Sequence, residues 1–103
     1  MIARTWHGIT PASKADAYLD VLNRTGIPEY HNTEGNRGVY VFRRIEGDQA
    51  HFLLISFWED RAAIERFAGP QIETAVYYPE DHEYLLEFEP TVTHYEVLVK
   101  PVY

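Results

Sequence analysis

The clearest pattern along the chain is a ten-residue apolar stretch at residues 49–58, which predicts a β-strand. Side chains on a strand point alternately to opposite faces, so this stretch divides into two sets. The two sets are His51, Leu53, Ile55, Phe57 and Phe52, Leu54, Ser56, Trp58. Both are mostly apolar, which indicates a strand that is buried on both of its faces.

Three further strands are predicted from the same kind of pattern. Residues 2–7 form the first and end at Gly8, residues 38–46 form the second, and residues 91–99 form the last. The Glu-Gly-Asp turn at residues 46–48 joins the second strand to the apolar strand as a hairpin. These two strands are therefore expected to be antiparallel neighbours.

The first helix is expected to begin at Thr10, a suitable N-cap, with Pro11 in its first position. Its apolar residues recur at helical spacing: they are Ala15, Tyr18, Leu19 and Leu22. Gly26 and Pro28 are expected to end this helix. Residues 27–36 then form a loop.

The second helix is expected to begin after Asp60, another suitable N-cap, and to be interrupted at residues 69–70 by Gly-Pro. Additional helical turns are expected at residues 71–78 and from 79 to about 86. The order of elements is β-α-β-β-α-β. This α+β order is the ferredoxin-like pattern, an antiparallel sheet with helices on one face, formed here by a single domain at residues 1–103.

Helices cover only one face of such a sheet, so the other face needs a different cover. We first place Phe52, Leu54 and Trp58 on this second face, where leaving each bare would forfeit about 1.5–3 kcal/mol. That total rivals the whole stability of a small domain. A second copy packed sheet against sheet is the simplest cover, because an isologous dimer needs only one patch. The alternative is that long loops of the same chain fold across this face. Which face carries Trp58 stays open: toward a partner its role is structural, and toward the helices it can touch a ligand.

Composition narrows the choice of partners. A formal net charge of −7 argues against nucleic acid and anionic membranes. No apolar run approaches the roughly 20 residues of a membrane span, and residues 1–7 lack the apolar core of a secretion signal. The absence of cysteine excludes disulfides and thiolate chemistry. We expect a cytoplasmic homodimer with no nucleic-acid partner and no membrane partner.

Two stretches resemble the antibiotic biosynthesis monooxygenase-like family of dimeric α+β barrels. Residues 52–63, FLLISFWEDRAA, are similar to that family's third strand running through a Trp into its second helix. Residues 92–97, VTHYEV, are similar to its last strand. The resemblance implies two sheets that pack into a barrel at the dimer interface, with a cavity in each subunit between sheet and helices.

The same resemblance implies several activities. Some members oxidise polycyclic phenols to quinones with O₂ and no cofactor, others bind and degrade haem, and many have no assigned reaction. The haem-degrading members use an Asn on the first strand and a His ligand with a Trp in the helical region. Here residues 2–8 contain no Asn, the second helix offers Phe67 and no Trp, and His82 lies beyond Pro79. Haem degradation is therefore not favoured.

The residue types that an oxygenase without a cofactor needs are present. Proton transfer near neutral pH suits histidine, and a ring-lined pocket suits a flat ligand. The candidate catalytic residues are His82, Tyr78 and His31, and the candidate substrate-binding residues are Trp6, Trp58, Tyr77, Arg43, His94 and Phe67. For each of them a packing or solvated role is the alternative.

No cofactor and no metal site is expected. The five histidines show no His-x-His or His-Glu-x-x-His spacing, and His94 with Glu96 is a strand pair better suited to hydrogen bonding. The favoured function is a small cofactor-independent monooxygenase acting on an aromatic or polycyclic molecule. The alternatives are a non-catalytic protein that binds a small ligand and a cyclase or isomerase on the same fold.

Overall fold

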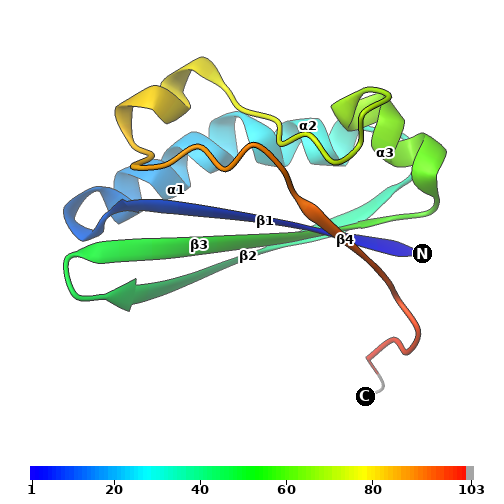
Figure 1. Ribbon diagram of the computed structural model, residues 1–103, viewed down its shortest axis with the longest axis horizontal. Coiled ribbons are helices and arrows are strands. Elements are labelled where there is room, and N and C mark those ends of the chain that lie inside the picture. The colour runs from blue at the N-terminus through cyan, green and yellow to red at the C-terminus, as the bar shows by residue number, and fades with distance from the viewer. Residues whose placement is uncertain (102–103) are drawn as a thin grey trace.

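Four antiparallel strands form one sheet in the computed structural model, which describes residues 1–101 (Figure 1). The strands are β1 (Ile2–Pro11), β2 (Asn36–Glu46), β3 (Gln49–Trp58) and β4 (Thr93–Glu96). Their order across the sheet is β2-β3-β1-β4. The predicted hairpin between β2 and β3 is confirmed, as is the ferredoxin-like arrangement as a whole.

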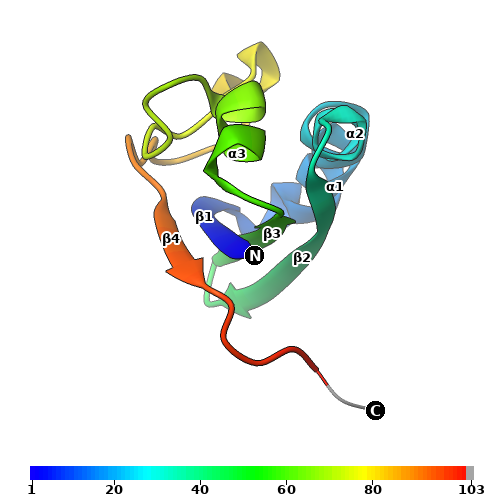
Figure 2. The same ribbon diagram turned by 90° about the vertical axis from the view of Figure 1, so that its right-hand side faces the viewer.

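The helices of the described chain all lie on one face of this sheet (Figures 1 and 2). They are η1 (Ala12–Lys14), α1 (Ala15–Arg24), α2 (Gly26–Asn32), α3 (Arg61–Ala68) and η2 (Pro79–Glu83). The predicted N-cap of α3 is confirmed, because Asp60 Oδ1 accepts a hydrogen bond from the Ala63 N–H at 2.9 Å. Gly69, with a φ of 84°, ends that helix.

The loop predicted at residues 27–36 is wrong, because most of it is α2. Pro28 is tolerated there because it lies in the first turn, where a backbone N–H has no helical acceptor. Thr25, whose backbone is not helical, separates α1 from α2. Thr10 belongs to β1 and does not cap α1, so the first helical turn begins only after Pro11.

The prediction that Gly8 ends the first strand is wrong, because Gly8 lies inside β1. A Cβ atom at this position would come within 2.2 Å of the Trp6 indole, so the glycine leaves room for that ring. The last strand is also shorter than predicted, covering only Thr93–Glu96.

The segment at residues 69–92, which we call the covering segment, connects α3 to β4 across the helical side of the sheet (Figure 2). The helical turns predicted at 71–78 are absent, since an isolated bridge between Thr74 and Thr91 holds this part in an extended form. The helix predicted from residue 79 is the short η2.

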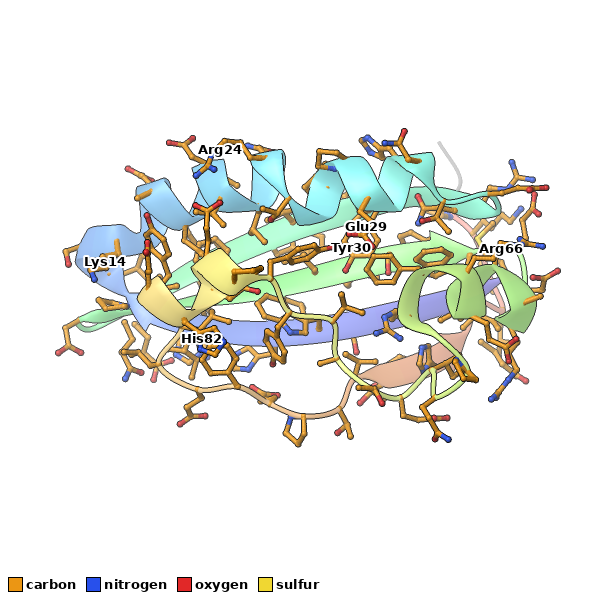
Figure 3. All side chains as sticks on the ribbon, turned by 90° about the horizontal axis from the view of Figure 1, so that it is seen from above. Lys14, Arg24, Glu29, Tyr30, Arg66 and His82 are labelled. Carbon is orange, nitrogen blue, oxygen red and sulfur yellow. The ribbon has the colours of Figure 1, made fainter. Side chains whose placement is uncertain are left out.

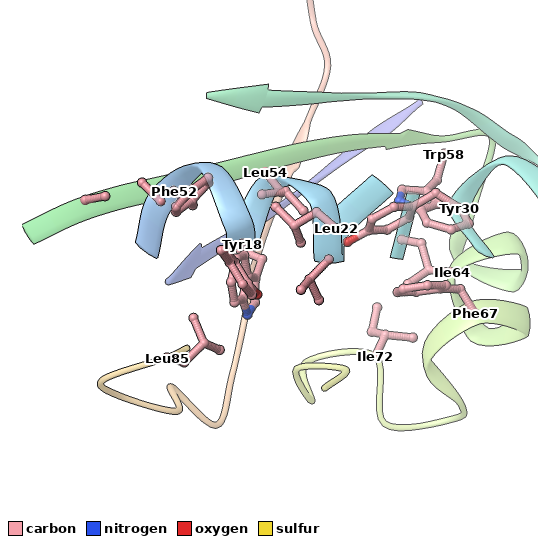
Figure 4. Close-up of a cluster of buried hydrophobic side chains, with 14 of the residues drawn as sticks. Tyr18, Leu22, Tyr30, Phe52, Leu54, Trp58, Ile64, Phe67, Ile72 and Leu85 are labelled. Atoms are coloured by element: carbon pink, nitrogen blue, oxygen red, sulfur yellow. The ribbon is translucent and has the colours of Figure 1, made fainter. Parts of the chain in front are cut away.

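The core lies between the sheet and the helices. Figure 4 shows Tyr18, Phe52 and Leu85 at one end of it and Trp58 with Phe67 at the other. Trp58 and Phe52 have no exposed surface. The helical face of β3 is therefore the set Phe52, Leu54, Ser56, Trp58.

This outcome corrects the assignment of the two faces. Phe52, Leu54 and Trp58 were placed on the face that needs a partner, but they pack under the helices. Alternation along a strand separates two sets without saying which set meets the helices. The uncovered face, which we call the open face, carries Leu53, Ile55, Phe57, Tyr40, Phe42 and Tyr95.

Candidate functional site

A small cavity lies between the helical face of the sheet and the covering segment. Side chains of every layer line it: Arg4, Trp6, Tyr18, Leu22, Tyr30, Leu54, Phe67, Val76, Tyr78, Asp81 and Val92, with Gly26 of α2. Its volume of about 30 Å³ suits one or two water molecules. Figure 3 shows Tyr30 reaching from α2 over the middle of the sheet, whereas Arg24 points outward. We call this space the aromatic cavity.

Arg4 of β1 brings a buried cation to the cavity, with only 2% of its surface exposed. Its guanidinium donates to the backbone carbonyls of Ile72 and Thr74 in the covering segment, the second at 2.9 Å. It also lies 3.2 Å from His94 Nε2 and 5.7 Å from the centre of the Phe67 ring. A residue of the first strand thus holds the covering segment in place.

The charge of Arg4 is not neutralised by an ion pair with any residue of the described chain. Burial lowers the pKa of Arg4, while Tyr30 and Glu73 act through space in the opposite direction. Backbone carbonyls satisfy the donors of a guanidinium without cancelling its charge. The cavity wall is therefore electropositive at this point.

Trp6, two residues further along β1, is 7% exposed and points to the same face. Its indole N–H is buried and has no hydrogen-bond partner within residues 1–101. The indole lies edge-on to Tyr77, with ring centres 6.2 Å apart. Burial raises the pKa of Tyr77, and the nearby Trp6 lowers it by a smaller amount. The two groups are near each other without an N–H···O contact of ordinary geometry.

Phenol groups form most of the polar wall opposite β1. The Tyr18 hydroxyl donates to Asp81 Oδ1 at 2.9 Å, and the Tyr78 hydroxyl donates to Glu29 Oε2 at 2.5 Å. Asp81, itself buried, also accepts from the Tyr78 backbone N–H at 2.7 Å. These contacts tie the covering segment to α1 and α2.

The same phenols hold their protons strongly. Burial and the neighbouring carboxylates raise the pKa values of Tyr18 and Tyr78 far above the usual range. Burial raises the pKa of Tyr30 to about 12. None of these three tyrosines therefore acts as a base near neutral pH.

His94 of β4 is the histidine nearest to this site. Burial and the Arg4 charge lower its pKa. Because Arg4 donates to Nε2, the ring is neutral and its proton is assigned to Nδ1. His94 thus accepts a hydrogen bond from Arg4 and does not itself line the cavity.

The structure brings only some of the predicted site residues together. Trp6, Tyr78 and Phe67 line the cavity, and Tyr77 lies beside Trp6. Trp58 packs behind the cavity against Phe67 and Tyr30, with its N–H donating to Ser56 Oγ at 2.9 Å.

The other candidates lie outside the cavity. Arg43 pairs with the exposed Asp16 at 2.7 Å. His82 is exposed and stacks on Phe88, and His31 is exposed on α2. Neither histidine reaches a ligand in the cavity from these positions.

Four lining residues with polar side-chain atoms were not among the predicted site residues: Arg4, Tyr18, Tyr30 and Asp81. Tyr18 was expected only as an apolar helix residue. Arg4 stands near the N-terminus in the short strand predicted at residues 2–7, and an arginine usually keeps its charge in water. Its burial depends on carbonyl groups 68 and 70 residues away, so no local signal marks it.

A second hollow, of about 240 Å³, lies on the open face. His7 links there to Glu89 at 2.5 Å through Nδ1 and to His51 at 3.0 Å through Nε2. Phe42, Leu53 and residues 43–44 complete its lining. Within residues 1–101, no three or more His, Asp or Glu side chains gather in a way that would hold a metal ion. The helices of this region are all too short or too polar to cross a membrane.

A sequence profile described as antibiotic biosynthesis monooxygenase matches residues 9–76. The chain belongs to this family. Among curated proteins, none matches the sequence. The family assignment confirms the resemblance found in the strand that runs into α3, which lies within the matched residues.

Solved structures support the same fold. A putative antibiotic biosynthesis monooxygenase from Nitrosomonas europaea superposes with a TM-score of 0.68 at 14% identity, covering 96% of this chain and all of that one. The haem degrader MhuD of Mycobacterium tuberculosis, with two haems in its active site, gives 0.61 at 17% identity over 99% and 100% of the chains. Rv0793 of the same organism gives 0.62 at 17% identity with the same coverage. Identities this low establish the shared fold alone.

Haem does not fit the residues of this cavity. None of its lining residues is a histidine, and His94 Nε2 is engaged by Arg4. The first-strand residues that line the space are Arg4 and Trp6, whereas the resemblance implies an Asn on this strand in haem degraders.

Proposed function

We propose that the protein is a homodimeric monooxygenase that oxidises a small aromatic molecule in the aromatic cavity without a bound cofactor. The observation that carries the proposal is a cavity walled by rings from both helices and sheet, with the buried guanidinium of Arg4 at its edge. Rings bind a flat substrate, and a buried cation favours an anionic form of it.

In this reaction the substrate itself supplies the electrons. A phenolate-type substrate with an activated ring carbon transfers electrons to O₂, one oxygen atom forms the new carbonyl group, and the other leaves as water. Arg4 would stabilise the anionic oxygen, and the covering segment would exclude water from the reactive anion. No described residue of the cavity has to change oxidation state.

A substrate larger than one or two waters requires the covering segment to move. Three contacts hold it closed over α1 and α2: Tyr18 to Asp81, Tyr78 to Glu29, and Arg24 to Glu80 at 3.0 Å. The last two are exposed and contribute little each, so opening mainly requires the buried Tyr18–Asp81 hydrogen bond and the Arg4 contacts to Ile72 and Thr74 to break. Motions of this kind gate many enzymes.

The dimer proposal rests on the open face. Tyr40, Phe42, Leu53 and Tyr95 are 54%, 47%, 39% and 58% exposed there. Beyond β4 the chain leaves the sheet on the side of the open face and exposes Leu98 and Val99 (Figure 1). A second copy packed on this face would bury these side chains. Each Å² of apolar surface removed from water would stabilise the dimer by about 25 cal/mol. Light scattering at micromolar concentration should give twice the mass of the chain, and a monomeric mass would refute the dimer.

The activity is tested with a hydroxylated anthrone under air, following O₂ uptake and the absorbance of the anthraquinone. Val76→Phe, which fills the cavity from the covering segment, should lower kcat/KM about tenfold. Ile45→Phe, at an exposed position outside the cavity, is the matched control and should leave the rate unchanged. Rates equal to the reaction without protein would reject the oxygenase.

The second candidate is a protein that binds the same kind of molecule without turnover. It is favoured by the raised pKa values of Tyr18, Tyr30 and Tyr78, which leave these phenols without a role as base. Ligand binding by calorimetry with no O₂ uptake would select this function.

A further inference from the structure

We propose that Arg4 and Trp6 form a recognition site for an anionic oxygen, so that the ligand of the aromatic cavity is an aromatic acid or a phenolate and not a neutral ring system. This inference rests on the proposed function for the location of the ligand and for an anionic oxygen near Arg4, and it adds Trp6 as a second donor to that oxygen. It specifies the chemical class of that ligand, and it holds equally for a catalytic and a non-catalytic protein.

The first observation is that Arg4 forms no ion pair within residues 1–101, and Glu73 acts on its charge only through space. The Arg4 guanidinium has five N–H donors, and three partners are present: the carbonyls of Ile72 and Thr74, and His94 Nε2. None of the three carries a negative charge when His94 is neutral. Burying a cation without a counter-ion is costly, and an anionic ligand would relieve that cost.

The second observation is that the indole N–H of Trp6 has no hydrogen-bond partner of ordinary geometry within residues 1–101, although the Tyr77 side chain lies near it. Buried polar groups nearly always have a hydrogen-bond partner, so an unpaired one calls for a specific reason. Trp6 lines the same cavity as Arg4. An indole N–H only donates, so the missing partner is an acceptor, such as a carboxylate or phenolate oxygen.

The third observation is that both groups come from the same surface of β1. Arg4 and Trp6 stand two residues apart on one strand face, opposite Ser56 and Leu54 of β3. Gly8 leaves the space that the indole occupies, because a Cβ there would overlap the ring. The backbone of β1 thus fixes both donors on the floor of the cavity.

The charge distribution across the cavity gives the ligand an orientation. Asp81 lines the roof, and its oxygens accept from the Tyr18 hydroxyl and the Tyr78 backbone N–H. A ligand anion would be repelled from this carboxylate and attracted to Arg4. The anionic oxygen therefore points to β1, and the ring of the ligand lies among Tyr30, Phe67 and Tyr78.

Calorimetric titration of the full-length protein with two probes tests this assignment. The probes are 2-naphthoate and its neutral isostere 2-naphthamide. The wild-type protein should bind naphthoate about 5-fold to 10-fold more tightly, the usual difference between a charge-assisted hydrogen bond and a neutral one. Arg4→Met should abolish this preference, whereas Arg4→Lys should retain part of it.

Trp6→Phe keeps a ring and removes only the N–H, so it should weaken both probes about 2-fold to 10-fold. Arg37→Met, at an exposed position that pairs with Glu59, is the matched control and should keep the wild-type preference. Circular dichroism and thermal unfolding monitor the fold of each variant. If Arg4→Met does not fold, the comparison of the two probes on the wild type and on Trp6→Phe decides.

Equal affinity for the two probes in the wild type, or an undiminished preference in folded Arg4→Met, would overturn the assignment. Anthrone oxidation that persists in either case leaves the proposed function standing without this recognition site. A preference for naphthoate with no oxidation of the anthrone would confirm the site and reject the oxygenase.

Discussion

The two faces of the sheet have similar apolar content, but the helices bury one face and leave the other exposed. On the covered face, Phe52 and Trp58 are fully buried and the space that remains is a cavity of about 30 Å³. On the open face, Phe42 and Tyr40 are about half exposed, stacked on each other with ring centres 5.6 Å apart. The same strands supply both faces, so the difference comes from what is packed on them.

The comparison also separates two kinds of polar group. The covered face holds Arg4, which has no ion pair within residues 1–101, and Trp6, whose N–H has no hydrogen-bond partner there. Both indicate a small ligand. The open face holds the Glu89–His7–His51 chain, in which the groups satisfy one another. Large apolar side chains without cover are expected to pack against another protein surface. A single buried cation without an ion pair is expected to bind a small anionic ligand.

The largest effect is expected from truncating the covered face. Trp58→Ala should lower the free energy of unfolding by about 3–5 kcal/mol, because it leaves a large cavity in a fully packed core. Phe57→Ala, the adjacent residue on the open face, is the matched control. Urea unfolding measured at a concentration where the chain is monomeric should show a much smaller loss for Phe57→Ala, and equal losses would contradict the assignment of the faces.

The next effect concerns the partner of the open face. Leu53→Lys places a charge in the middle of the apolar patch and should weaken self-association at least about 100-fold. Light scattering and sedimentation over a range of concentrations measure this change. Glu87→Gln, on the exposed covering segment, changes the net charge by the same one unit and should leave the mass unchanged. A dimer that survives Leu53→Lys would show that the open face is not the interface.

A smaller effect tests the packing of Trp6. Gly8→Ala should cost about 1–3 kcal/mol, because the added methyl group overlaps the indole and forces it to move. The Trp6 fluorescence should shift in the same variant. The loss should largely disappear when Gly8→Ala is made in a Trp6→Ala background, as a double-mutant cycle would measure. Additive losses would mean that Gly8 serves the strand and not the ring.

The smallest effect is a pH dependence on the covered face. The folded-state pKa of His94 lies below its unfolded value of about 6.5, so the unfolded chain binds the proton more readily. Stability should therefore be complete above pH 7 and fall as the pH drops through that unfolded value, levelling off below the folded pKa. Urea midpoints between pH 7.5 and pH 5 measure this slope, which His94→Gln should reduce. An unchanged slope would assign it to other groups.

Local features of the fold were predictable from short segments of sequence. The hairpin turn between β2 and β3 and the Asp60 cap of α3 each depend on a few neighbouring residues, and both are confirmed. α2 was missed because Gly26 and Pro28 usually end a helix, whereas here they belong to the first turn of a new one. Gly8 was misread as a strand end because its role depends on where the Trp6 ring lies.

The candidate site was predictable only in part. The rings of Trp6, Phe67 and Tyr78 were identified because aromatic residues suit a flat ligand, and they do line the cavity. His31 and His82 were chosen for their chemistry, but nothing in their spacing places them near the cavity, and both are exposed. Arg4 was missed because its surroundings are assembled from the covering segment.

The sequence by itself determined that β3 has two apolar faces, that the sheet is antiparallel and that the chain is ferredoxin-like, because these follow from alternation, turns and caps within a few residues. Only the tertiary structure decided which face the helices cover, where the cavity lies and that Arg4 is buried without a counter-ion. Those properties arise from contacts between residues that are some 70 positions apart, and no local pattern encodes them.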